Sequence, residues 1–153
     1  MKDKDLLNLL KPVAVIDPAV YDDDNTPTAI DMKGYATALF LIHIGAGGIT
    51  FTTTNKVEFK LTHSDDDSTY TAVTVDDLQG ISSVGTGGIV KSLVAAHASA
   101  SLTAFSYKGG KRYLKLLADF GGTHSTGTAL EAVVIKGGDR KSTRLNSSHR
   151  IRS

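Results

Sequence analysis

The chain has 153 residues, a formal net charge of +1, 41% hydrophobic residues and no cysteine. This length is sufficient for one domain with its own core, and the lack of cysteine excludes disulfides, thiolate catalysis and cysteine-bound zinc. No apolar run is long enough to span a bilayer as a helix, and the N-terminus lacks the apolar segment of a secretory signal. We therefore expect no membrane partner.

The positive charge of the chain is concentrated at its C-terminus. Residues 139–153 hold five basic residues and one acid, a net charge of +4, which leaves −3 for the rest of the chain. A domain with that charge is not expected to bind nucleic acid. The segment DRKSTRLNSSH at 139–149 resembles the translation of a common sequencing adapter, which implies metagenomic reads. We interpret 139–153 as an artefactual or disordered tail, with a natural basic tail as the alternative.

Residues 1–27 are predicted to form an N-terminal arm followed by an acidic loop. The segment DKDLLNLL at 3–10 matches one or two helical turns, because acids stand at its start and Pro12 follows its end. A helix this short is marginal on its own. A docking arm and a frayed terminus are therefore both open, and an edge strand over 13–16 follows.

About eight further short strands, punctuated by glycine and polar turns, are expected along residues 28–138. They cover 28–32, 36–44, 57–62, 69–75, 89–95 and 101–107, followed by two long antiparallel strands within 105–135 that are joined by a Gly/Thr/Ser loop. This spacing is typical of sandwiches and barrels, and no βαβ rhythm indicates a parallel sheet. We predict a single all-β domain, a jelly-roll-like antiparallel β-sandwich with a short N-terminal arm.

Two of these strands differ in their pattern. Residues 57–62 alternate apolar and polar side chains, as a half-buried antiparallel strand does, and 69–75 is expected to return as its hairpin partner. Residues 36–44 (ATALFLIHI) are instead apolar on both faces, with Phe40 and Ile42 on one of them. Such a strand is either central in a sandwich or covered by a partner.

Among the segments of the sequence, the acidic turns are the most similar to a metal-binding loop. Calcium takes six to eight oxygen ligands from a loop that alternates ligands and contains a turn glycine. Asp65, Asp66 and Asp67 do not follow that pattern, so we favour a solvated hairpin turn and keep the three only as weak metal candidates. No cofactor is expected.

Catalytic residues are not evident. Ser64 follows His63, and Ser125 follows His124, but neighbouring side chains on a strand point apart, and neither pair lies in a nucleophile elbow. We predict that the chain is not an enzyme. A basic cluster around 108–115 faces either an acidic partner or solvent. The candidate interaction residues are Leu6, Leu7, Leu9, Leu10, Phe40, Ile42, Lys111 and Arg112.

Three segments carry a family resemblance: IDMKGYATALFLIHIG at 30–45, VEFKLTHSDDDSTYTAV at 57–73, and YKGGKRYLKLLADFGGTHSTGTALEAVVIKGG at 107–138. Together they resemble a family of small proteins encoded among the head and connector genes of tailed phages and prophages. His63, Ser68 and the Gly137-Gly138 ending depart from the family's usual acid, glycine and Gly-His-Pro. The resemblance implies a virion structural protein made in the bacterial host cytoplasm.

The resemblance further implies a capsid decoration or cement role, in contact with the major capsid protein or other virion proteins. We expect a homo-oligomer, with a trimer favoured because it suits a capsid junction. The alternative is a carbohydrate- or receptor-binding module on the same fold class. That module would need exposed aromatic side chains, and the chain has no Trp, five Tyr and five Phe.

Overall fold

The computed structural model describes residues 5–138, so the expected tail at 139–153 lies outside the described residues. One helical turn and a short 3-10 helix accompany ten strands in this part of the chain. In chain order the elements are α1 Leu6–Leu9, β1 Lys11–Tyr21, β2 Ile30–Asp31, β3 Thr37–Ile44, β4 Lys56–Ser64, β5 Thr71–Ala72, η2 Val75–Asp77, β6 Leu78–Gln79, β7 Ile89–Leu93, β8 Ser101–Tyr107, β9 Tyr113–Gly121 and β10 Thr128–Gly137.

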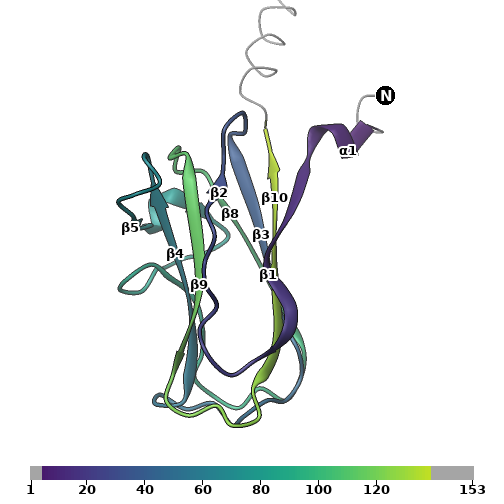
Figure 1. Ribbon diagram of the computed structural model, residues 1–153, viewed down its shortest axis with the longest axis vertical. Coiled ribbons are helices and arrows are strands. Elements are labelled where there is room, and N and C mark those ends of the chain that lie inside the picture. The colour runs from purple at the N-terminus through teal and green to yellow at the C-terminus, as the bar shows by residue number, and fades with distance from the viewer. Residues whose placement is uncertain (1–4, 139–153) are drawn as a thin grey trace, which may run out of the picture.

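The strands form two antiparallel sheets that face each other (Figure 1). We call the sheet with order β1-β10-β3-β8-β6 the first sheet, and the sheet with order β2-β9-β4-β5, in which β7 also pairs with β4, the second sheet. Strand β1 pairs with β10, β2 with β9, β3 with β8 and β4 with β7. The chain is thus a long antiparallel ribbon rolled into two layers, which is the jelly-roll arrangement.

The expected all-β, jelly-roll-like sandwich is therefore confirmed, and eight strands make up its roll. The remaining two, β5 and β6, are two-residue strands in the connection between β4 and β7. Alternation along the strands places one apolar side chain of every two between the sheets. Strand β4 shows this most clearly, with Val57, Phe59 and Leu61 fully buried.

Two strand pairings differ from what local pattern implied. Strands β9 and β10 are the long strands expected within 105–135, but they lie in opposite sheets, and the loop between them crosses the sandwich. The expected hairpin of β4 with 69–75 is reduced to β5. The chain turns away after β5 because Thr74 caps the 3-10 helix η2, with its backbone N–H donating to Asp77 Oδ2 at 2.8 Å.

Strand β1 is much longer than the edge strand expected over 13–16. It pairs with β10 from Lys11 to Tyr21, with register shifts on both sides of Ile16, so this segment belongs to the sandwich and not to the arm. Two prolines, Pro12 and Pro18, are tolerated because β1 is the outermost strand of the first sheet. Of the described residues, only 5–10 precede the sandwich.

The acidic loop after β1 is bound to the second sheet. The backbone N–H of Ala118 donates to Asn25 Oδ1 at 2.7 Å, and the Asn25 amide donates to the Leu116 carbonyl at 3.2 Å. The Phe120 N–H donates to Asp24 Oδ1 at 2.7 Å. These side chains take the place of a strand along β9 beyond the two residues of β2, so they satisfy backbone groups on an otherwise open edge.

Candidate interaction surfaces

The outer face of the second sheet has the polar character expected of a solvated surface. Lys56 Nζ lies 3.1 Å from Glu58 Oε2, and Lys60 Nζ lies 2.5 Å from Asp119 Oδ2. The Lys60–Asp119 hydrogen bond raises the pKa of Lys60. Lys115 adds a cation–π contact, with its Nζ 4.4 Å from the centre of the Tyr70 ring.

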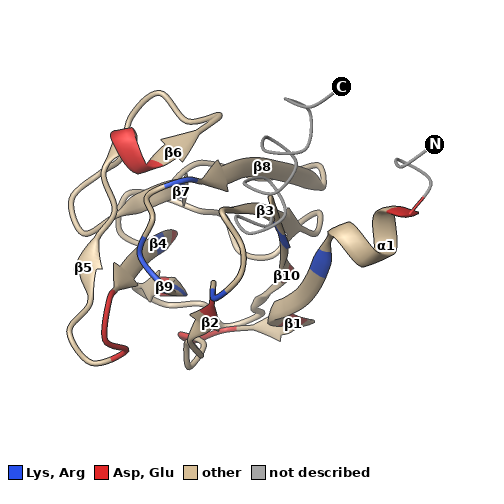
Figure 2. Cartoon of the chain, turned by 90° about the horizontal axis from the view of Figure 1, so that it is seen from above, with Lys and Arg blue, Asp and Glu red and all other residues tan. Residues whose placement is uncertain are grey.

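The outer face of the first sheet carries less charge, because β3 and β8 contain no Lys, Arg, Asp or Glu (Figure 2) and β10 contributes Glu131 to this face. Register places Ala14, Val133, Leu41 and Ala104 in one row across four adjacent strands. The next row contains Pro12, Ile135, Leu39 and, on β8, Ser106. Strand alternation directs these side chains away from the core.

We call this surface the apolar face. It consists of Pro12, Ala14, Leu39, Leu41, Leu102, Ala104, Val133 and Ile135. Leu39 is 38% exposed and Leu102 is 62% exposed, while Leu41, Val133 and Ile135 are half-buried. Contiguous aliphatic patches on protein surfaces are characteristic of sites of contact with other proteins or with membranes. Its side chains are aliphatic, so it does not offer the aromatic platform expected of a carbohydrate module.

At one end the apolar face continues into a hollow of ≈ 330 Å³. Its lining is mostly apolar and comes from the end of β1, the end of β3 and the start of β10. The lining residues are Pro18, Ala19, Val20, His43, Gly45, Ala129, Leu130 and Glu131. His43 Nδ1 lies 3.4 Å from Glu131 Oε1 and forms the polar side of the hollow. Val20 is 65% exposed, so it is open to contact.

The arm lies at the other end of β1. Helix α1 projects beyond the first sheet instead of folding against it (Figure 1). Leu6, Leu7 and Leu9 are 56%, 83% and 49% exposed, whereas Leu10 is half-buried and its Cδ2 lies over the Cα of Gly137. The helical turn expected within 3–10 is thus present over Leu6–Leu9, and its contact with a partner stays a prediction.

Phe40 and Ile42, two of the candidate interaction residues, are fully buried within the chain's own core. The Phe40 ring stacks on Phe105 with 5.1 Å between ring centres. The sequence left open whether residues 36–44 are buried in the core or by a partner. For the face of β3 that carries Phe40 and Ile42, the answer is the core. The opposite face, with Leu39 and Leu41, is the one that a partner can contact.

Lys111 and Arg112 are both engaged within the chain. Lys111 Nζ lies 2.9 Å from Asp65 Oδ2, and Arg112 donates two hydrogen bonds of 2.9 Å to the Asp31 carboxylate. The Arg112 guanidinium lowers the pKa of Asp31 to about 2. A role for these two cations in binding an acidic partner stays a prediction, and it would compete with these pairs.

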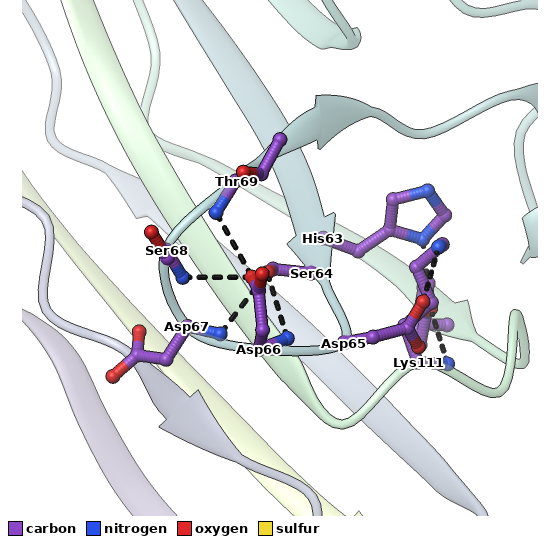
Figure 3. A network of polar contacts seen from close by, with 9 residues as sticks. His63, Ser64, Asp65, Asp66, Asp67, Ser68, Thr69 and Lys111 are labelled. Atoms are coloured by element: carbon purple, nitrogen blue, oxygen red, sulfur yellow. Dashed lines mark hydrogen bonds and ion pairs between the residues drawn. The ribbon is translucent and has the colours of Figure 1, made fainter.

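Asp65, Asp66 and Asp67 point to different partners and do not converge (Figure 3). Asp66 Oδ1 accepts hydrogen bonds from the Ser68 and Thr69 N–H groups, both at 2.9 Å, and one from Ser64 Oγ at 2.8 Å. The backbone donors lower the pKa of Asp66 to about 2. Asp65 pairs with Lys111, and Asp67 accepts from the Tyr70 hydroxyl. The triplet therefore closes a turn, as one expects of Asp beside Ser and Thr.

His63 and Ser64, the adjacent pair considered for catalysis, contact different groups. His63 Nδ1 lies 2.8 Å from the buried Tyr107 hydroxyl, whereas Ser64 Oγ donates to Asp66. Within the described residues no group of three or more His, Asp or Glu side chains is placed to hold a metal ion. None of the helices in this part of the chain has the length and hydrophobicity that a membrane crossing requires.

Sequence reasoning did not single out Val133, Ile135, Leu102 or Ala104. A signal was present, since 129–135 carries apolar residues on both faces, as 36–44 does, with Glu131 as the exception. The sequence did not show that these two strands are neighbours, paired from Leu130↔Ile44 to Gly137↔Thr37. Only that pairing joins two half-strips of aliphatic residues into one continuous face.

Neither a protein-family model nor a curated protein matches this sequence. Among solved structures, the chain is similar to the SPBc2 prophage-derived protein YomS, with a TM-score of 0.48 and 10% identity over 84% of this chain and 93% of that one. It is also similar to a chain of the Bacillus endospore appendages, disulfide-linked pili, with a TM-score of 0.29 and 15% identity over 83% and 89% of the two chains. At these levels of similarity no function is transferred.

Proposed function

We propose that the chain is a non-enzymatic structural protein of a phage or prophage virion that acts by protein–protein contact. The observation that supports this most is the contrast between its two outer faces. Both come from strands of similar length and alternation, yet the second sheet presents paired charges and the first presents aliphatic side chains. Solvent alone would select polar residues on both faces, so the apolar face has a partner.

The finer proposal is capsid decoration, with the major capsid protein or another virion protein as the partner. It is supported by the sequence resemblance to phage head-region proteins. A protein that binds only the assembled shell stabilises it by mass action, because every bound copy must be released before the shell comes apart. The apolar face supplies the contact, and a trimer at a capsid junction remains the preferred stoichiometry.

Sedimentation with purified capsids of the phage or prophage that encodes the chain tests this proposal. The wild-type protein is expected to co-sediment. Leu41→Lys, in the middle of the apolar face, is expected to reduce the bound fraction at least tenfold, since it buries a charge at the contact. The matched control is Leu117→Lys, which places the same change on the outer face of the second sheet, where Leu117 is also half-buried beside Lys60.

Two results would count against the proposal. One is a wild-type protein that fails to co-sediment at any salt concentration. The other is an equal loss of binding in both lysine variants while each still unfolds at the wild-type temperature. A gene for a major capsid protein next to the coding sequence would give independent support.

A further inference from the structure

We propose that the arm of one copy docks in the hollow of a second copy, so that copies of this chain join head to tail. This inference rests on the proposed function, because it takes the chain to be a contact protein and names one of its partners as the chain itself. It is carried by two unpartnered apolar features at opposite ends of β1. One protrudes and the other is recessed.

The arm offers apolar side chains and little else. Leu6, Leu7 and Leu9 are 56%, 83% and 49% exposed on a single helical turn. The polar groups beside them are satisfied locally, since Asn8 Nδ2 donates to Asp5 Oδ1 at 2.6 Å. A helix of four residues has little stability of its own. The arm therefore gains most from a contact that buries its leucines.

The hollow has the size and lining that a leucine side chain requires. Ala19, Val20 and Ala129 supply apolar walls, and its volume is ≈ 330 Å³. An apolar cavity of about 150 Å³ accommodates benzene, so one leucine fits and a second can follow it. The hollow is continuous with the apolar face through His43 and Glu131, which lie across β3 and β10 from one another.

The arm of the same chain cannot reach this hollow. Lys11 and Val20 pair with Lys136 and Ala129 of β10, which are seven residues or about 23 Å apart. Leu7 and Leu9 precede Lys11 by four and two residues, which span at most about 14 and 7 Å when fully extended. Each copy thus carries a protrusion and a recess that it cannot bring together itself.

A contact of this kind joins two different surfaces, so it is heterologous. Such contacts close into a ring when the rotation between copies allows it and extend into a filament when it does not. A two-fold contact between apolar faces would instead be self-complementary and would stop at a dimer. These two modes differ in what happens when two defective copies are mixed, and this difference makes the inference testable.

The experiment uses sedimentation velocity of the full chain alone. The wild type is expected to form species larger than a dimer as concentration rises. An arm variant, Leu7→Asp with Leu9→Asp, and a hollow variant, Val20→Asp, are each expected to sediment as monomers. An equal mixture of the two is expected to form a dimer and nothing larger, because one intact arm meets one intact hollow. Val75→Asp, which changes a 40% exposed valine at the first position of η2, is the matched control and should behave as wild type.

The inference is overturned if the mixture stays monomeric while the wild type assembles, if the arm variant still assembles alone, or if the wild type is a monomer at every concentration. Thermal unfolding checks that each variant is folded. If Val20→Asp does not fold, Ala19→Asp takes its place as the hollow variant. Binding to capsids is measured separately, by the co-sedimentation experiment described above. An arm variant that still co-sediments with capsids, beside a wild type that does not self-associate, would refute head-to-tail joining and leave the proposed function standing.

Discussion

His63 shows how a single side chain acquires a role that its neighbours in sequence do not reveal. It is followed by Ser64 and three aspartates, yet it lies within β4, one residue before the end of the strand, and is 6% exposed. Its Nδ1 lies 2.8 Å from the Tyr107 hydroxyl, which in turn accepts the Lys111 N–H at 3.0 Å. The ring thus ties the end of β4 to the turn between β8 and β9.

Burial lowers the pKa of His63 below its ordinary value of 6.5, and this effect outweighs the nearby Asp77 carboxylate, which raises it. The unfolded chain therefore takes up a proton at a higher pH than the folded chain does. The stability that neutral His63 contributes is complete above 6.5 and is lost as pH falls toward the lower folded pKa.

We therefore predict that the melting temperature of the wild type falls as pH is lowered from about 7 to about 5. His63→Gln keeps a hydrogen-bonding group but does not titrate, so its melting temperature should change less over the same range. Circular dichroism melts at several pH values measure both slopes. A slope as steep in the variant as in the wild type would assign the acid sensitivity to other groups.

The two faces of strand β3 differ in their surroundings. Phe40 is fully buried against Phe105, while its neighbour Leu39 is 38% exposed on the apolar face. The strand reads as apolar throughout, so the sequence left open whether its residues are buried in the core or by a partner. The structure places one face in the core, and burial of the other face by a partner stays a prediction.

These adjacent residues give a paired prediction at the scale of the strand. Phe40→Ala should lower the free energy of unfolding by about 3–5 kcal/mol, because it removes a buried ring and leaves a cavity. Leu39→Ala should change it by less than about 1 kcal/mol but should weaken binding to capsids. Urea unfolding and co-sedimentation together measure the two effects. A large loss of stability in Leu39→Ala would mean that the apolar face belongs to the domain's own core.

At the scale of the whole molecule, the outer faces of the two sheets differ in their charge. The second sheet covers its outer face with charge pairs, and Lys111 and Arg112 are held by Asp65 and Asp31. Under the proposed function, contact through the first sheet is expected to depend on apolar burial and not on charge.

Salt distinguishes these two kinds of contact. We predict that capsid binding is retained or strengthened when NaCl is raised from about 0.1 to about 1 M, because apolar burial is not screened whereas exposed ion pairs are. Lys111→Ala and Arg112→Ala should accordingly leave binding within about twofold of wild type, since surface pairs contribute little. Co-sedimentation across a salt series measures this. Binding that disappears at high salt would instead favour the basic cluster as the contact.

The sequence by itself determined the fold class, the approximate positions of most strands and much of the core. These follow from local signals, since alternation in β4, glycine and aspartate turns and β-branched runs act over a few residues. Tertiary structure alone decided three other features. It placed β10 beside β3, it placed β9 and β10 in opposite sheets, and it bound Asn25 along β9. They join residues about a hundred positions apart, and no local pattern encodes which strand will lie beside which. The apolar face and the hollow exist only through those long-range pairings, which is why the surfaces that carry the proposed function could not be assembled from the sequence.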